Sequence, residues 1–298
     1  MVNVAGDKSS SYRGRFAPSP SGPLHMGSLL SALGSYLDAR AHGGEWLLRI
    51  EDIDPPRELP GADLLIRKSL LAHGFRWDDE PLYQHTRSPA YDQALAWLLC
   101  HGHAYYCTCS RQQFDTGTNL HADSCPQSEQ RPAERAAVRL RGTTEQLLFH
   151  DCMLGPITLA NAEGADFVLL RKDGLYSYQL AVVVDDAGQR ISDVIRGRDL
   201  LSSTPCQIRL HQLLGLRVPR YGHLPLLLNE QGQKLSKQNL ARPLEDTHAP
   251  DNLLRCLVAL GQPSPPDPVG TDCAAILDWA TLHWDRARIP LNDSVQRE

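Results

Sequence analysis

The sequence predicts an α/β fold built on a parallel sheet, and the first fifty residues carry this prediction. Residues 15–17 form the end of a short strand, and the proline-rich residues 18–23 predict a rigid turn, because they suit neither a helix nor a central strand. Leucines then recur at helical spacing from about residue 27 to 42, and residues 46–50 form a short apolar strand. This order of strand, loop, helix and strand is the repeating unit of a parallel sheet.

The rest of the chain divides into helical, strand and irregular stretches. Leucines at three- and four-residue spacing predict helices near 61–74 and 88–102. Residues 103–150 are rich in Cys, Gln, Thr, Arg and Asp, and they are predicted to be an insertion. Strand candidates lie at 166–172, 179–184, 191–195 and 224–228, and a turn is predicted at 185–188. A helix is predicted at 199–215 and a loop at 229–239. The chain is then predicted to be helical from 245 to the proline-rich break at 263–268.

Length and composition bound the class of protein. A chain of 298 residues predicts two compact domains, or one large domain with an insertion. The composition is 42% hydrophobic and 22% charged, which is ordinary for a soluble protein, and the chain contains no apolar run long enough for a membrane span. The first dozen residues lack the apolar core of a signal peptide. We therefore expect a cytoplasmic protein without membrane association. A monomer is expected as well, although no pattern in the sequence reports the oligomeric state.

Charge is distributed unevenly along the chain. The net charge of −5 and the pI of about 6.2 do not fit a protein that is a basic nucleic-acid binder as a whole. Residues 196–242, however, hold 8 basic and 2 acidic side chains, whereas residues 1–195 and 243–298 carry net charges of −6 and −5. Two interpretations of this basic segment stay open: chance clustering on a solvated face, or a patch that meets phosphate groups.

The first motif that suggests chemistry is His25-Met26-Gly27-Ser28, which stands at the predicted start of a helix. A helix N-terminus offers unpaired N–H groups and partial positive charge, so it attracts phosphate. Gly27 allows a ring or a phosphate to approach the backbone closely, and His25 can donate a hydrogen bond to a phosphate oxygen as charge develops there. An ordinary helix start is the alternative interpretation.

The second motif, Lys234-Leu235-Ser236-Lys237-Gln238, lies in the predicted loop after the strand at 224–228. Two lysines three residues apart suit a mobile loop that clamps a triphosphate, because an ammonium group offsets the charge of a pyrophosphate leaving group. The chain has only five lysines, and two of them fall in this pentapeptide. That scarcity favours a function over the alternative, a solvated loop.

The third feature is a cluster of cysteines at residues 100–125, which holds four of the eight in the chain. Without a secretory signal, a disulfide framework is not expected. Zinc takes four nitrogen, sulfur or oxygen ligands in a tetrahedron. The candidate ligands are Cys107, Cys109, His121 and Cys125. Cys100 and His103 are alternative fourth ligands, and an insertion without metal is the remaining interpretation.

Together these motifs carry a resemblance to a known family. His25-Met26-Gly27-Ser28 is similar to the HIGH motif of class I aminoacyl-tRNA synthetases, and residues 234–238 are similar to their KMSKS motif, in the same order and about 200 residues apart. Residues 15–27 resemble the glutamyl-tRNA synthetase version of the signature, as do residues 49–54 with Arg57 after them. The resemblance extends from about residue 13 to 245 and identifies the chain as a member of the glutamyl/glutaminyl subgroup.

The resemblance implies a Rossmann-like, doubly wound parallel sheet with an inserted zinc-binding, acceptor-type subdomain and a short helical C-terminal region. The implied domain organisation is a disordered leader at 1–12, two halves of a nucleotide-binding catalytic domain at 13–102 and 176–242, an insertion at 103–175 and a helical region at 243–298.

It also implies an amino-acid pocket. Arg15 is placed near a carboxylate of glutamate, and Glu51 meets the α-ammonium group; arginine forks and a carboxylate are the partners that these groups need. The implied pocket residues are Arg15, Phe16, Ala17, Pro18, Ser19, Glu51, Tyr178 and Arg196. ATP is implied to contact His25, Gly27, Ser28 and Lys237, and the catalytic residues are implied to be His25, Lys234 and Lys237. The alternative role for Arg196, a surface phosphate contact, suits Arg198 better.

Two further features point to one branch of the subgroup. In that branch, Cys-x-Cys is followed by Tyr-x3-Cys, and His121 occupies the tyrosine position here. Only 60 residues follow Gln238, and residues 243–298 are acidic, so we expect no anticodon-binding domain. This combination resembles the glutamyl-Q tRNA(Asp) synthetases. That family activates L-glutamate with ATP in the absence of tRNA and attaches it to queuosine at the wobble position of tRNA(Asp).

The implied reaction uses ATP with Mg²⁺, and the insertion holds one structural Zn²⁺. The glutamate α-carboxylate attacks the α-phosphate of ATP, and a cyclopentene hydroxyl of queuosine then attacks the adenylate. The basic segment, together with arginines of the insertion, is expected to face the anticodon stem-loop. Three alternatives stay open: a truncated synthetase that charges tRNA(Glu), a small nucleotidyltransferase without an RNA substrate, and a non-catalytic tRNA-binding paralogue.

Overall fold

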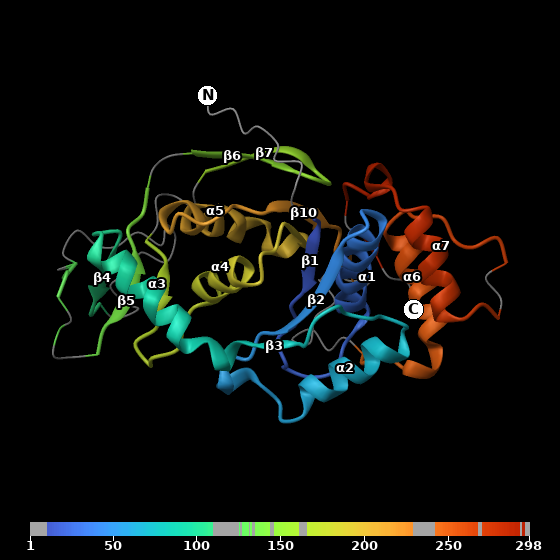
Figure 1. Cartoon of the computed structure of the whole chain (residues 1–298), viewed down its shortest axis with the longest axis horizontal. Coiled ribbons are helices and arrows are strands. Elements are labelled where there is room, and N and C mark those ends of the chain that lie inside the picture. Colours follow the sequence, from blue (N-terminus) through green and yellow to red (C-terminus); the bar gives the residue numbers. More distant parts are fainter. Residues whose placement is uncertain are drawn as a thin grey trace.

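The computed structural model describes residues 11–109, 125, 127–130, 132, 135–143, 146–160, 166–228, 242–267, 270–292 and 294–295. Within these residues, parallel strands form the centre of the molecule, a small sheet beside α3 lies at one end, and helices α6 and α7 lie at the other (Figure 1). The predicted leader falls almost entirely outside the described residues.

The central strands pair in two parallel groups. β1 pairs with β2, which pairs with β3, and β9 pairs with β10. The two groups meet where the backbone N–H of Ser192 donates to the carbonyl oxygen of Arg13 at 2.9 Å. The strands are β1 (Arg13–Phe16), β2 (Glu45–Ile50), β3 (Leu82–Tyr83), β9 (Asp193–Gly197) and β10 (Arg220–Leu224).

Helices cover both faces of these strands, as the alternation of side chains along a strand requires. Leu48 on β2 and Ile195 on β9 pack in the same cluster as the leucines of α1 (Met26–Ala41). Their neighbours Leu47 and Val194 point the other way and pack with Ile208 of α5 (Thr204–Leu213). The strands are therefore buried on both faces, which is the doubly wound arrangement that the sequence predicts.

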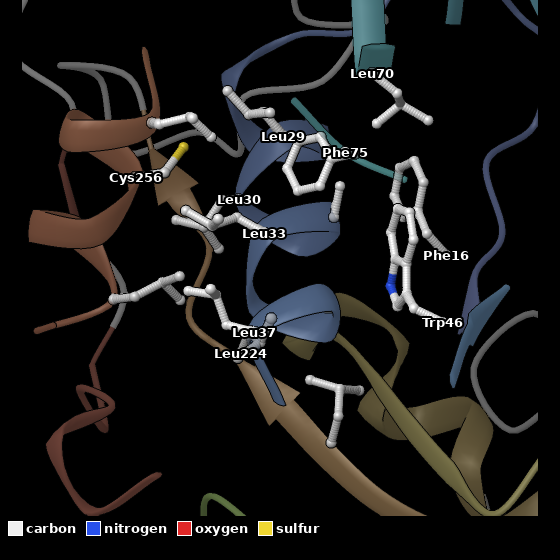
Figure 2. Packing of buried hydrophobic residues seen from close by; sticks show 14 of the residues in the cluster. Phe16, Leu29, Leu30, Leu33, Leu37, Trp46, Leu70, Phe75, Leu224 and Cys256 are labelled. Carbon is white, nitrogen blue, oxygen red and sulfur yellow. The ribbon is translucent and has the colours of Figure 1, made fainter. Parts of the chain in front are cut away.

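Helix α1 is enclosed by its surroundings, and Figure 2 shows why its leucines fall on more than one face. Leu224 and Cys256 lie on one side of the helix, whereas Phe16, Trp46 and Phe75 lie on the other. The leucines of α1 that join this core are Leu29, Leu30, Leu33 and Leu37, each at most 1% exposed. This burial fixes the direction in which the N-terminus of α1 points.

Residues 103–175 contribute to two different sheets. β4 (Ala104–Cys107), β5 (Ala137–Leu140) and β8 (Val168–Leu170) form a separate antiparallel sheet. The antiparallel hairpin of β6 (Gln146–Asp151) and β7 (Gly155–Ala160) instead joins the central sheet, because β6 runs parallel to β10 with Asp151 opposite Tyr221. The hairpin thus lies next to the strands that carry the candidate site.

The prediction of a strand at 179–184 and a turn at 185–188 was wrong, because this segment is helix α4 (Tyr178–Gly188). The side-chain oxygen of Ser177 caps the helix by accepting a hydrogen bond from the backbone N–H of Leu180. An apolar run that is buried on all sides has the same pattern in a strand as in a helix. Asp185 and Asp186 lie in the last turns of this helix, and both are buried.

The other predicted helices are found close to their expected bounds. The stretch near 199–215 is a 3₁₀ helix (Arg198–Ser203) that leads into α5. The remaining elements are α2 (Ala62–Ala72), α3 (Ser88–Cys100), α6 (Ala249–Ala259), α7 (Cys273–Leu282), β11 (Leu227–Leu228), β12 (Ser294–Val295) and short 3₁₀ turns at Pro55–Arg57, Gln84–Arg87, Asp246–His248 and Arg286–Arg288.

A buried carboxylate fastens the C-terminal region to α1. Asp38 is fully buried and accepts hydrogen bonds from Tyr12, from Trp284 at 2.8 Å and from Arg286 through two nitrogens, each at 2.7 Å. Burial raises the pKa of Asp38, but the hydrogen bonds and charge of Arg286 outweigh this effect and hold the pKa below its ordinary value. The ion pair with Arg286 and the hydrogen bond from Trp284 therefore tie the segment after α7 to helix α1.

Replacing Asp38 by Asn should lower the free energy of unfolding by about 3 kcal/mol, because it leaves a partly buried guanidinium without its counter-ion. Urea unfolding measures the change. Arg288→Gln is the matched control: it removes an exposed pair with Asp285 (3.5 Å) from the adjacent 3₁₀ turn and should change stability by less than about 0.5 kcal/mol. Equal stability of Asp38→Asn and wild type would contradict this role.

Candidate active site

The N-terminus of α1 is organised by His25 and Ser28. Nδ1 of His25 accepts a hydrogen bond from the backbone N–H of Ser28 at 3.3 Å, and Oγ of Ser28 accepts one from the backbone N–H of His25 at 2.8 Å. This reciprocal arrangement is a capping box. Because Nδ1 accepts, the proton of a neutral His25 ring lies on Nε2. The ring is thus oriented with a donor on its far nitrogen, at the positive end of a 16-residue helix.

The predicted clamp residues Lys234 and Lys237 lie outside the described residues, which stop at Leu228 at the end of β11 and resume at Arg242. The backbone N–H of Leu244 donates to the carbonyl oxygen of Leu24 at 2.9 Å. Leu24 precedes His25, so residue 244 lies directly beside the N-terminus of α1.

Arg196 on β9 is a buried cation surrounded by neutral groups. Its side chain is 5% exposed. The guanidinium contacts are Gln207 Oε1 at 2.8 Å, Thr204 Oγ1 at 2.8 Å, His223 Nε2 at 3.2 Å, the Tyr178 hydroxyl at 3.3 Å and the carbonyl oxygen of Leu200 at 3.3 Å. No carboxylate among the described residues forms an ion pair with it. A buried charge without a counter-ion is costly, so Arg196 is prepared to receive an anion.

The neighbouring arginines differ from Arg196 because each has a carboxylate partner. Arg15 pairs with Asp186 at 3.0 Å, and Arg49 pairs with Asp186 at 2.8 Å and with Glu51 at 3.3 Å. All four side chains are at least nine-tenths buried, and their two positive and two negative charges balance. Burial raises the pKa of Asp186, but Arg15 and Arg49 outweigh it and lower the pKa to about 2.

Of the two carboxylates in this cluster, Glu51 has its ionised form less well stabilised by the neighbouring arginines. Burial raises its pKa, while the charges of Arg49 and Arg15 oppose the rise without cancelling it. An ammonium group placed beside Glu51 would favour its ionised form further. The backbone N–H of Glu51 donates to the carbonyl oxygen of Pro18 at 3.0 Å, so the turn after β1 is fixed next to the end of β2.

Tyr178 lies between Arg196 and the charge-balanced cluster. Burial raises the pKa of its hydroxyl, and the charges of Arg196, Glu51 and Arg15 all act on the same group. The structure therefore brings together Arg15 of β1, Glu51 directly after β2, Tyr178 of α4 and Arg196 of β9. Phe16, in contrast, stacks on Trp46 in the hydrophobic core with ring centroids 6.3 Å apart.

Sequence reasoning missed four polar residues of this site. Three of them, Thr204, Gln207 and His223, contact Arg196 directly, and the fourth, Asp186, balances Arg15. Asp186 did leave a signal, because two adjacent acidic residues at the end of a fully apolar run predict buried charges with partners. His223 left none, since a single histidine in a short strand has no distinctive pattern.

Three cysteines of the predicted metal site converge. The sulfur atoms of Cys107, Cys109 and Cys125 lie within 4.8 Å of one another, and those of Cys107 and Cys125 are 4.0 Å apart. Zinc–sulfur bonds of about 2.3 Å in a tetrahedron place sulfur atoms roughly 3.8 Å apart, so the spacing fits zinc, and it is far too long for a disulfide. His121 lies outside the described residues, and the described Cys100 and His103 are not part of the cluster.

Several described basic side chains of the segment 196–242 have partners within the protein. Arg196 is buried, Arg198 donates to the carbonyl oxygens of Pro290 and Leu291, and Arg220 pairs with Asp193 at 2.7 Å. At least three of its eight basic side chains therefore have partners within the chain.

In the part of the chain that the structure describes, no helix is long and apolar enough to cross a membrane.

Solved structures of related enzymes match the fold. The structure of a glutamate tRNA ligase from Elizabethkingia meningosepticum in complex with its amino acid has a TM-score of 0.77 and 25% sequence identity, and the match covers 96% of this chain and 67% of that one. A glutamate-tRNA synthetase from Elizabethkingia anophelis has the same TM-score at 24% identity, covering 97% and 68% of the two chains. The predicted α/β fold with a parallel sheet is confirmed.

Sequence comparisons give the family. Residues 11–259 match the family of class I tRNA synthetases (E and Q), catalytic domain. The glutamyl-Q tRNA(Asp) synthetase of Pseudomonas fluorescens is 50% identical over 96% of both chains, and that of Yersinia pestis is 47% identical over 98% of this chain and 91% of its own. The chain is therefore a ligase of the aminoacyl-tRNA synthetase type that belongs to the glutamyl-Q tRNA(Asp) synthetases.

Proposed function

We propose that this protein activates L-glutamate with ATP in the absence of tRNA and transfers it to queuosine-34 in the anticodon of tRNA(Asp). The observation that carries glutamate recognition is Arg196, a buried cation without a carboxylate partner among the described residues, beside Tyr178. The names of the similar synthetases support tRNA(Asp) as the acceptor.

The distribution of charge assigns each group of glutamate to a partner. The α-carboxylate must stay accessible because it reacts, and Glu51 is the carboxylate suited to the α-ammonium group. Arg196 and Tyr178 then hold the side-chain carboxylate, since Arg15 is already engaged with Asp186. The turn that closes the pocket is contributed by Phe16, Ala17, Pro18 and Ser19. Phe16 anchors it in the hydrophobic core.

The first step joins glutamate to AMP. An oxygen of the α-carboxylate attacks the α-phosphorus of ATP, the bond from that phosphorus to the bridging oxygen breaks, and pyrophosphate leaves. His25 and the N–H groups at the start of α1, with Gly27 and Ser28, stabilise the charge on the phosphate. Lys234 and Lys237 hold the leaving pyrophosphate, and Mg²⁺ accompanies the nucleotide.

In the second step, a cyclopentene hydroxyl of queuosine attacks the acyl carbon of the adenylate, its proton is lost, and AMP leaves. We further propose that Cys107, Cys109 and Cys125 hold one structural Zn²⁺, with His121 as the fourth ligand. The protein acts as a monomer in the cytoplasm.

Labelled glutamate, ATP and separate tRNA pools test the function. We expect label on tRNA(Asp) that carries queuosine, and glutamate-dependent pyrophosphate exchange without any tRNA. Label on tRNA(Glu) would identify a synthetase of the ordinary type, and equal labelling of tRNA(Asp) lacking queuosine would refute the proposed acceptor. Exchange with no label on any tRNA would identify a nucleotidyltransferase that acts without RNA.

Replacing Arg196 by Gln should raise the KM for glutamate by about 100-fold, because a buried charge-assisted contact to the side-chain carboxylate is lost. The KM for ATP should change less than about twofold, since Arg196 is not proposed to contact the nucleotide. Pyrophosphate exchange measures both. Arg217→Gln, an exposed arginine after α5, is the control and should leave both constants unchanged. An unchanged KM for glutamate in Arg196→Gln would disprove this pocket.

Metal analysis after dialysis against a chelator tests the zinc site. Wild type should retain one Zn²⁺ per chain, and Cys109→Ser should lose it, because a closed tetrahedral site needs all of its ligands. Cys100→Ser, an exposed cysteine outside the cluster, is the control and should keep the metal. His121→Ala should lose it as well; equal zinc in this variant and wild type would exclude His121 as an essential ligand.

A further inference from the structure

Arg196 is held on one side by a histidine that reaches it from the neighbouring strand. In the parallel pairing of β9 with β10, Arg196 lies opposite His223. Nε of Arg196 and Nε2 of His223 are 3.2 Å apart, and His223 is fully buried. The Nε atom of Arg196 donates its hydrogen bond to His223, so this contact helps to set the rotation of the guanidinium, together with the hydrogen bonds of its other two nitrogens to Gln207 and Thr204.

The contact with Arg196 fixes which nitrogen of His223 carries the proton. A guanidinium always bears a hydrogen on Nε and has no lone pair to offer. Nε2 of His223 must therefore be the acceptor, and the proton of the neutral ring must lie on Nδ1. On that side, Oδ2 of Asp151 lies 2.5 Å away and accepts the hydrogen bond. The donor Arg196 at Nε2 and the acceptor Asp151 at Nδ1 therefore require the same tautomer of His223.

Asp151 is itself held firmly at the end of β6. Its Oδ1 accepts hydrogen bonds from the backbone N–H groups of Met153 at 2.9 Å, Leu154 at 3.0 Å and His223 at 3.2 Å. Burial raises the pKa of Asp151, but its hydrogen bonds with His223 and the backbone outweigh this effect and keep the pKa below its ordinary value. The turn of the β6–β7 hairpin therefore presents a fixed, ionised carboxylate to His223.

We propose that Asp151 and His223 form a positioning pair that orients Arg196 for the side-chain carboxylate of glutamate, and that this orientation requires a neutral His223. The proposal rests on the proposed role of Arg196 in glutamate binding. Neither residue touches the substrate: Asp151 sets the tautomer of His223, and His223 aims the guanidinium.

Charged groups around His223 determine when it is neutral. Burial lowers the pKa of His223, and Arg196 on β9 lowers it as well, whereas Asp151 on β6 and Asp199 in the 3₁₀ helix before α5 raise it. The groups that face it from α5 and β10, Thr204 and the ring of Tyr221, are uncharged. The net pKa lies below the ordinary value of 6.5, so His223 is neutral above that pH.

Protonation of His223 would add a hydrogen to Nε2, so that the ring would carry an N–H on both nitrogens. The new N–H would point directly at the Nε–H of Arg196. Two donors and two positive charges would then face each other across 3.2 Å. The KM for glutamate should therefore be constant above pH 7 and should rise as the pH falls through the pKa of His223. A purely structural network would affect glutamate and ATP alike.

Asp151→Asn is the sharpest test, because the amide is the same size and can donate to Nδ1, which forces the proton onto Nε2. We expect the KM for glutamate at pH 7.5 to rise by about tenfold, as for one lost buried hydrogen bond to a charged group, with the KM for ATP changed by less than about twofold. His150→Gln on the same strand removes an exposed imidazole and should leave both constants and their pH dependence unchanged.

His223→Gln separates orientation from titration. The glutamine side chain can keep an acceptor near Nε of Arg196 but cannot be protonated. The KM for glutamate should rise less than in Asp151→Asn, and its increase at acid pH should disappear. Persistence of the full acid-side increase in His223→Gln would overturn the proposal.

The ring proton can also be located without any assay of activity. Nitrogen-15 NMR of the full-length wild type, with the His223 signals assigned by their loss in His223→Gln, should show a protonated Nδ1 and an unprotonated Nε2 at neutral pH. A protonated Nε2 would overturn the proposal, and this readout needs no measurement of activity. If Arg196→Gln raises the KM for glutamate but Asp151→Asn does not, the positioning pair is refuted while the pocket remains. If neither does, the pocket itself is refuted.

Discussion

The structure depends on which of its buried arginines are paired with carboxylates, because a guanidinium removed from water needs an anion nearby. Arg49, which is fully buried, has two carboxylates within 3.3 Å, and Arg15 has one within 3.0 Å. Arg196 is buried almost as deeply and has only neutral partners among the described residues. The charges of the first two arginines are therefore balanced within the fold, whereas the third keeps a positive charge without a carboxylate partner among the described residues. That difference is the reason for proposing Arg196 as the recognition group of the pocket.

Helix α4 is the element through which the fold and the pocket constrain each other. Asp186 near its end pairs with Arg15 of β1 and Arg49 of β2, while the adjacent Asp185 accepts hydrogen bonds from Gln84, Arg87 and Tyr91 at 2.6 to 3.0 Å. The helix also begins with Tyr178, which contacts Arg196. A single helix thus places one pocket residue at its start and neutralises the neighbouring arginines at its end.

The sequence predicted the first half of the fold closely and the second half less well, for a physical reason. The strand, turn and helix around His25 have local signals: prolines, a cap and leucines at helical spacing. The segment of α4 has none that separates a helix from a strand, because it is buried on all sides. Likewise, the motif residues Arg15, Glu51, Tyr178 and Arg196 could be named in advance, whereas their partners depend on contacts between elements that no local pattern encodes.

The neutral shell around Arg196 has a consequence for how such a site can be built. A carboxylate in direct contact would orient the guanidinium but would also cancel its charge and compete with the substrate. Neutral acceptors orient it without cancelling its charge, although their rotamers then need support of their own. Asp151 supplies that support from one side chain further away, where it fixes the ring of His223 without contacting Arg196 itself. Separating the orienting charge from the binding charge by one imidazole lets the pocket be rigid and electropositive at once.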